Sequence, residues 1–154
     1  MLVEVILVVL AVLCVVGVYL WTRLAATGAR VIDRQDGHLE QVFYGGVMSR
    51  YLLTSGTMVR LELFDWGVRV RGTPVSRWLV PTWEARYDEL AIAELVALPA
   101  SRLAVCFRLR GGGEPSMAFL SDRTTSILRA LESRGVPVNR SVTRIRRIRE
   151  LYPS

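Results

Sequence analysis

The sequence predicts an α+β protein in which an N-terminal transmembrane helix precedes an antiparallel sheet that a helix closes. Three observations predict this class. The chain opens with an uncharged apolar run. Several short runs with alternating apolar and polar residues follow it. A later stretch near residue 125 has helical spacing with marked ends. Strands followed by one closing helix indicate an antiparallel sheet rather than alternating βαβ units.

The apolar run covers residues 5–22 and reads VILVVLAVLCVVGVYLWT, without a charged residue. As a helix it would be about 27 Å long, close to the hydrocarbon thickness of a bilayer. Tyr19 and Trp21 stand at its trailing edge, where aromatic rings favour the headgroup level. We therefore expect residues 1–24 to form a transmembrane helix that contacts the lipid bilayer through residues 2–22.

A cleaved signal peptide is the alternative for this run. Residues 25–29, AATGA, are small enough for a cleavage site. However, a signal peptide has a basic n-region, and the only charged residue before the run is Glu4. The run is also longer than a usual h-region, so the sequence favours a retained anchor.

Basic residues predict the orientation of this anchor. None precedes the run, whereas Arg23, Arg30 and Arg34 follow it. The positive-inside rule places the N-terminus outside and the rest of the chain in the cytoplasm. All 20 basic residues are arginine, a bias that a high-GC bacterial genome produces. We therefore expect a single-pass protein of the bacterial inner membrane.

The rest of the chain is long enough for one compact domain and too short for two. Residues 25–37 form a polar connector that contains glycine. The predicted cytoplasmic domain covers residues 38–138, and residues 139–154 form a basic tail. Cys14 and Cys106 lie in different apolar runs, so no disulfide framework is expected.

Residues 57–72 give the clearest strand signal. Val59, Leu61 and Leu63 alternate with polar neighbours and share one face. Asp65-Trp66-Gly67 predicts a tight hairpin loop, in which glycine would supply a positive φ. Further strands are expected at 38–44, 50–53, 90–98, 102–110 and 116–120. Gly45-Gly46 would end the first of these, and a short turn would precede the strand at 90–98. Residues 78–87 would form either a strand on each side of Pro81 or one edge strand with a bulge.

A helix with both ends marked follows the last strand. Ser121 or Asp122 would cap its start, and residues 127, 128 and 131 form its apolar stripe. Gly135 after the stripe predicts a glycine C-cap, and Val136 after it predicts an apolar contact.

Three stretches carry a resemblance to a known family. They read VRLELFDWGVRVRG, PTWEARYDELAIAELV and RLAVCFRLRGGGEPSMAFLSDRTTSILRALESRGVPV. Over residues 40–138 the chain resembles a bacterial pleckstrin-homology-like domain of the PH and GRAM superfamily. The resemblance implies a seven-stranded, strongly bent antiparallel sheet, a partly open barrel, capped at one end by the C-terminal helix.

The sequence carries no signature of an enzyme, a cofactor or a metal. Its one histidine, His38, has no nucleophile placed with it. Asp88-Glu89 is typical of a turn, and residues 111–113, GGG, lead into a strand rather than a helix, unlike a phosphate cradle. The basic C-terminus follows no recognised nucleic-acid module. We expect neither catalysis nor nucleic-acid binding.

Arg60, Arg69 and Arg71 are the candidate lipid-headgroup residues. Lipid-binding members of the family that the chain resembles use a basic residue in the first strand and a basic-x-Arg pair in the second. Strand alternation places the three arginines on the outward face, where they could converge on one phosphate. Glu62 lies between them and weakens this hypothesis, and any exposed arginine-rich hairpin would show the same pattern.

The tail is the second candidate lipid contact. Its apolar residues from Val142 to Tyr152 recur at helical spacing. They could form an amphipathic helix at the membrane surface, or they could pack on the domain and leave the arginines in solvent. The sequence leaves both open. The candidate membrane-surface residues are Arg140, Arg144, Arg146, Arg147 and Arg149.

These observations predict a membrane-anchored, non-catalytic cytoplasmic PH-like module that binds or scaffolds another protein at the inner membrane. The partner would dock on the exposed sheet edge or against the C-terminal helix. The alternative is direct binding of anionic lipid headgroups by the basic hairpin and the tail.

Overall fold

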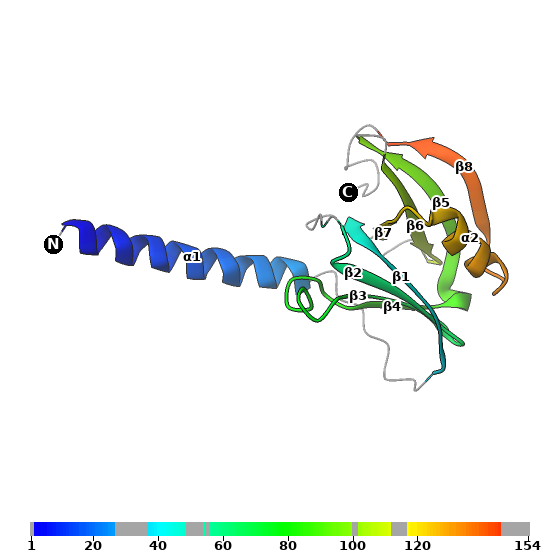
Figure 1. The fold of residues 1–154 in the computed structure, drawn as a ribbon, viewed down its shortest axis with the longest axis horizontal. Coiled ribbons are helices and arrows are strands. Elements are labelled where there is room, and N and C mark those ends of the chain that lie inside the picture. The colour runs from blue at the N-terminus through cyan, green and yellow to red at the C-terminus, as the bar shows by residue number, and fades with distance from the viewer. Residues whose placement is uncertain are drawn as a thin grey trace.

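In the computed structural model the chain forms one N-terminal helix and one sheet domain (Figure 1). The structure describes residues 2–26, 37–48, 54, 56–99, 102–111 and 117–145, with side chains in the first helix from residue 6 to residue 18. The elements are α1 (Leu2–Ala26), β1 (Leu39–Met48), β2 (Val59–Phe64), β3 (Gly67–Gly72), β4 (Trp83–Arg86), η1 (Tyr87–Glu89), β5 (Leu90–Leu98), β6 (Arg102–Leu109), β7 (Met117–Leu120), α2 (Thr124–Glu132) and β8 (Val138–Arg144).

The first helix, α1, projects away from the sheet domain (Figure 1). Within the described residues, no helix has both the length and the apolar character needed to cross a membrane. This finding contradicts the predicted transmembrane helix at 1–24, its bilayer contact through 2–22, and the single-pass inner-membrane location.

The strands form one bent sheet with the order β4-β3-β2-β1-β7-β6-β5-β8. Two antiparallel meanders, β1–β4 and β5–β7, are joined by the pairing of β1 with β7. The helix α2 follows β7 and packs against the second meander. This is the PH-like architecture that the resemblance implies. It has an additional strand, β8, which pairs parallel to β5 at the end of the sheet.

β1 joins the two meanders by changing its partner at Gly45. It pairs with β2 up to that residue and with β7 from Gly46 onward. A Cβ at Gly45 would lie 2.0 Å from the carbonyl oxygen of Leu120, so only glycine permits this approach. The prediction that Gly45-Gly46 ends the strand was therefore wrong. The strand predicted at 50–53 lies outside the described residues.

The hairpin of β2 and β3 is confirmed, with Asp65 and Trp66 as its two-residue loop. The predicted role of Gly67 is corrected, because it is not among the described glycines with positive φ. A Cβ at Gly67 would instead lie 2.3 Å from the carbonyl oxygen of Ala85. The glycine is needed because β4 passes close to the backbone of β3 there.

Only the second half of the aromatic stretch at 78–87 is a strand, the short β4. Residues 73–82, called the β3–β4 loop below, form consecutive turns between Pro74 and Pro81. The predicted turn before the next strand is confirmed, since η1 leads directly into β5.

The C-terminal end of α2 agrees with the prediction, whereas its start differs. Gly135 has φ +79°, and the N–H of Val136 donates to the carbonyl of Leu131 at 3.2 Å. Val136 is buried, as a glycine C-cap with an apolar contact requires. At the start the cap position is Arg123, whose N–H donates to Ser121 Oγ at 3.2 Å.

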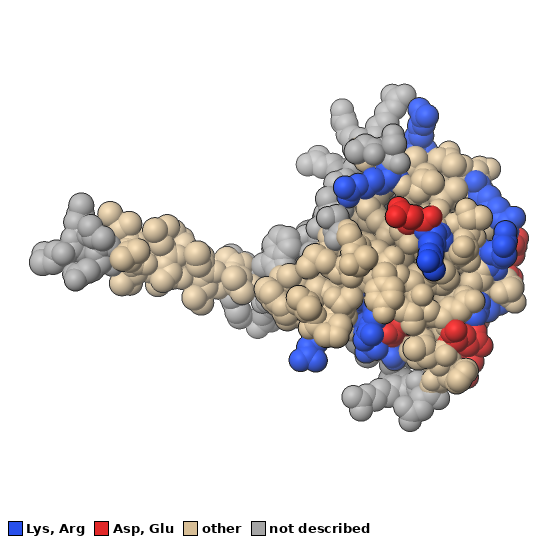
Figure 2. Space-filling model, in the orientation of Figure 1, with Lys and Arg blue, Asp and Glu red and all other residues tan. Residues whose placement is uncertain are grey.

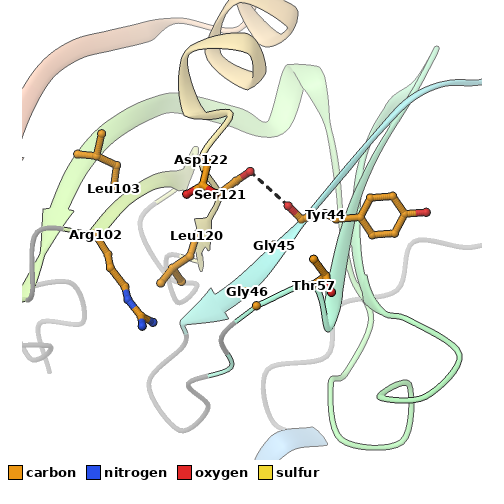
Figure 3. Close-up of a pocket in the computed structure, with 10 residues that line it drawn as sticks. Tyr44, Gly45, Gly46, Thr57, Arg102, Leu103, Leu120, Ser121 and Asp122 are labelled. Atoms are coloured by element: carbon orange, nitrogen blue, oxygen red, sulfur yellow. Dashed lines mark hydrogen bonds between the residues drawn. The ribbon is translucent and has the colours of Figure 1, made fainter.

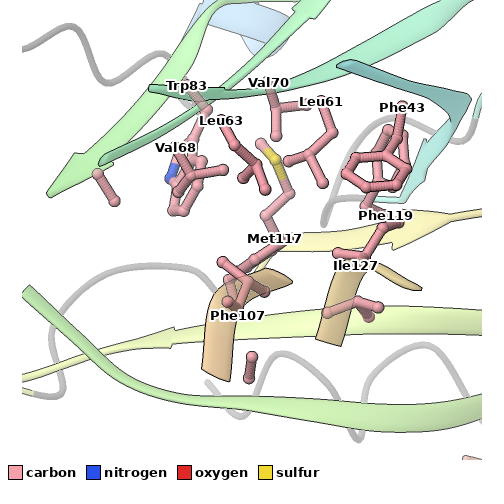
Figure 4. Packing of buried hydrophobic residues seen from close by; sticks show 14 of the residues in the cluster. Phe43, Leu61, Leu63, Val68, Val70, Trp83, Phe107, Met117, Phe119 and Ile127 are labelled. Carbon is pink, nitrogen blue, oxygen red and sulfur yellow. The ribbon is translucent and has the colours of Figure 1, made fainter. Parts of the chain in front are cut away.

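The main core lies between the two meanders and α2 (Figure 4). A second buried cluster lies on the other face of β6 and β7 and includes Ala104, Cys106 and Ile145. The residues of β7 are therefore all buried. The sequence predicted strands with one apolar face, but β6 and β7 have a buried cluster on each face.

Candidate functional site

The structure brings the three candidate headgroup arginines together on neighbouring strands. Arg60 of β2 stands opposite Arg71 of β3, and Glu62 stands opposite Arg69. Period-two alternation places all of them on the face that points away from the main core. They form a network with Glu62 and with Glu84 of β4, called the arginine–glutamate network below.

Glu62 is the centre of this network and is only 1% exposed. Its Oε1 lies 3.0 Å from Arg60 Nε and 2.8 Å from Arg71 Nη2. Its Oε2 lies 3.9 Å from Arg69 Nη1. Arg69 Nε donates to Glu84 Oε1 at 2.5 Å. The arginines therefore converge on carboxylates of the same chain.

This geometry bears directly on headgroup binding. Three guanidinium groups and two carboxylates leave a formal charge of +1 in the network. Arg69 is further held by the ring of Phe64, 4.7 Å from its guanidinium carbon. A phosphate would have to compete with Glu62 and Glu84 for the same N–H donors. Headgroup contact through Arg60, Arg69 and Arg71 thus stays a prediction.

The candidate tail residues are only partly within the described chain. Arg140 and Arg144 lie exposed in β8, whereas Arg146, Arg147 and Arg149 lie outside the described residues. The helical spacing from residue 139 was misleading, because residues 138–144 form a strand. Ile145 is buried in the second cluster, and its N–H donates to the carbonyl of Ala97 at 2.9 Å. This part of the tail packs on the domain.

A pocket of about 650 Å³ opens where β1 changes partners (Figure 3). Arg102 and Asp122 are the charged residues in its lining, and Ser121 Oγ donates to the carbonyl of Tyr44 at 3.3 Å. The sequence did not predict this pocket, because its walls come from segments far apart in the chain: β1, the residues before β2, β6, the end of β7 and the residues before α2.

A second pocket of about 820 Å³ lies between β1, η1 and α2. Arg134 crosses its wall, pairs with Glu40 and approaches the ring of Tyr87 at 6.0 Å. The Tyr87 hydroxyl donates to the carbonyl of Phe64 at 2.7 Å. Burial raises the pKa of Tyr87 to about 12, against the smaller opposing effect of Arg134.

Raising the pH should destabilise the fold through Tyr87. In the unfolded chain a tyrosine loses its proton near pH 10, whereas in the fold Tyr87 keeps it to about pH 12. Between these values the unfolded chain binds fewer protons, so the free energy of unfolding falls as the pH rises. Urea unfolding across this pH range should show that the free energy of unfolding falls. In Tyr87→Phe this free energy should depend less on the pH. Tyr44→Phe, at an exposed tyrosine, should leave this dependence unchanged. An unaltered slope in Tyr87→Phe would contradict the assignment.

Arginines are spread over the visible face of the sheet domain, with fewer acidic residues among them (Figure 2), in agreement with a formal net charge of +6. In the described parts of the chain, no three His, Cys, Asp or Glu side chains gather closely enough to hold a metal ion.

No protein-family model matches this sequence, and no curated protein is similar to it. Among solved structures, the chain is similar to the Vps36 N-terminal PH domain with a TM-score of 0.47 and 10% sequence identity. The similarity covers 70% of this chain and 88% of the other. At this level it tells nothing about the ligand or partner of this chain.

Proposed function

We propose that this PH-like domain is a non-catalytic binding module that docks a protein partner along the β8 edge of its sheet. β8 has seven residues and ends the strand order, and in the described part of the chain no strand pairs with its outer side. Such an edge offers unpaired N–H and C=O groups to an added strand. This observation carries the proposal.

The opposite edge is a poorer docking site. β4 has only four residues and directly follows the loop that contains Pro81. Its outward-facing Glu84 is buried and tied to Arg69. A partner strand would find fewer free backbone groups there than along β8.

The side chains of β8 indicate the chemistry of the partner. Arg140 and Arg144 are exposed, and the ion pair of Arg140 with Glu132 is itself exposed. The ladder with β5 is irregular between residues 139 and 143. Such a bulge discourages pairing of the edge with a second copy of the same strand. An extended acidic peptide fits this edge.

The proposal predicts that a proline at Arg144 weakens peptide binding. The N–H of Ile145 points to β5, so alternation directs the N–H of Arg144 outward. The full-length chain would be panned against a displayed peptide library, and the affinity of enriched peptides measured. We expect Arg144→Pro to weaken binding about tenfold, the equivalent of 1.4 kcal/mol, because backbone hydrogen bonds are lost.

Arg144→Ala is the matched control, since it removes the same side chain but keeps the outward N–H, so it should bind more tightly than Arg144→Pro. Equal binding by the parent chain and Arg144→Pro would contradict docking at β8, and so would a library that yields no binding peptide.

Direct headgroup binding by Arg60, Arg69 and Arg71 is the weaker proposal. The net charge supports it in general terms. The arginine–glutamate network opposes it, because Glu84 already accepts a hydrogen bond from Arg69 Nε, and Glu62 accepts from Arg71 Nε and Nη2.

A further inference from the structure

The β3–β4 loop presents two large apolar side chains to solvent. Val75 is 79% exposed and Trp78 is 63% exposed. Among the large hydrophobic residues described between positions 37 and 145, these are the two most exposed. Single exposed apolar residues are ordinary, but two of them three positions apart in one loop form an apolar tip that needs a reason.

The loop that carries this tip is firmly anchored to the sheet. Ser76, between the two exposed residues, is fully buried, and its hydroxyl donates to the carbonyl of Met58. The N–H of Thr73 donates to the same carbonyl at 3.0 Å. The N–H of Val80, which is buried, donates to the carbonyl of Ser76 at 3.0 Å. The exposure of Val75 and Trp78 is therefore built into an ordered loop.

The indole of Trp78 is also fixed. Its Nε1–H donates to the carbonyl of Val75 at 2.9 Å. The polar group of the ring is thus satisfied inside the loop, while the ring itself remains exposed. Moving this side chain into an apolar environment would leave no unpaired N–H, and little conformational freedom would be lost.

The charges around the tip are basic. Arg77 stands between the two exposed residues, and no Asp or Glu occurs from residue 73 to residue 82. At the base of the loop Arg60 and Arg71 face each other across β2 and β3. Glu62 neutralises one of these charges. The end of the domain that bears the tip therefore carries excess positive charge, which complements an anionic surface.

We propose that Val75 and Trp78 insert into the interfacial region of an anionic lipid bilayer, with Arg77 contacting the headgroups. The tip belongs to a projecting loop at the end of the domain that faces α1 (Figure 1). A bilayer interface takes up such a convex tip without a preformed pocket, and indole rings favour that depth. The proposal goes beyond peptide docking at β8 and depends on different residues.

The test places an environment-sensitive fluorophore at each of two exposed valines in turn. Val75→Cys labels the tip, and Val142→Cys labels β8, both in a full-length Cys14→Ser chain, since Cys106 is buried. Vesicles of phosphatidylcholine, with or without phosphatidylserine, are added. We expect a severalfold rise in emission and protection from an aqueous quencher at position 75, with phosphatidylserine present, and no change at position 142.

Comparing two positions in one chain separates insertion of the tip from adsorption of the exposed apolar residues of α1. Trp78→Ala and Arg77→Glu, each in the Val75-labelled chain, should lose most of the emission change and keep the melting temperature, because both side chains are exposed. Arg144→Pro should leave the change intact, so failure of peptide docking and failure of insertion can be told apart.

Three results would overturn the proposal. The first is an equal response at both labelled positions, which means general adsorption. The second is a water-like signal at position 75 on anionic vesicles, which means that the tip stays in water. The third is an unchanged response after Trp78→Ala.

Discussion

Glu62→Ala should lower the free energy of unfolding by about 3 kcal/mol, the range found when one partner of a buried ion pair is removed. The carboxylate is 1% exposed and lies within ion-pair distance of Arg60, Arg69 and Arg71. Without it, Arg69 keeps its ion pair with Glu84, whereas Arg60 and Arg71 lose the carboxylate that they share. Their mutual repulsion and the loss of hydrogen bonds in a poorly hydrated site both favour the unfolded chain. Urea unfolding, followed by tryptophan fluorescence, measures the change.

Glu94→Ala is the matched control for this loss. Glu94 Oε2 pairs with Arg108 Nε at 2.8 Å, but the pair is partly exposed. Exposed pairs contribute at most about 1 kcal/mol, so this variant should stay close to the parent chain. If Glu62→Ala and Glu94→Ala were equally mild, the network would be a loose surface cluster, and its arginines would be available to a phosphate.

Trp83→Ala should destabilise the fold by about 4 kcal/mol, as large core truncations do. Trp83 is 2% exposed and lies in β4 at the edge of the first meander. Its ring contacts Phe107 of β6, with the ring centroids 5.7 Å apart. The contact joins the two meanders across the main core (Figure 4). Chemical denaturation of the full-length chain measures the loss.

Two variants test the cause of this loss. The indole nitrogen of Trp83 is buried and finds no hydrogen-bond partner among the described residues. Trp83→Phe should therefore cost far less than alanine, roughly 1 kcal/mol, because it keeps most of the ring. Trp78→Ala, at the exposed tryptophan, should leave stability within about 0.5 kcal/mol of the parent. A large loss in Trp78→Ala would instead make the β3–β4 loop part of the stability of the fold.

The two proposed surfaces are built in different ways. The β8 edge offers backbone groups and exposed arginines, whereas the β3–β4 loop offers apolar side chains held by a buried serine. Because the two surfaces share no residue, we expect Arg144→Pro to affect only peptide docking and Trp78→Ala only membrane insertion. A chain with both surfaces can hold a peptide partner close to an anionic lipid surface.

Local features of the sequence determined much of the sheet domain. Alternation in residues 57–72 predicted the β2–β3 hairpin, because period-two burial is imposed by strand geometry alone. Gly135 predicted the end of α2, because this position needs a positive φ, which few residues other than glycine adopt at low energetic cost. The alternating run at 102–110 likewise predicted β6.

Contacts between distant segments decided the rest, and no local pattern contains them. Helical spacing at 139–152 predicted a helix, but residues 138–144 instead pair with the edge of β5 and form a strand. Glu62 was expected on a wet face, yet arginines from two strands enclose it. For the candidate sites, the sequence placed Arg60, Arg69 and Arg71 on one face. Only the tertiary structure showed that carboxylates hold them and that Trp78, expected in a strand, stands exposed on an anchored loop.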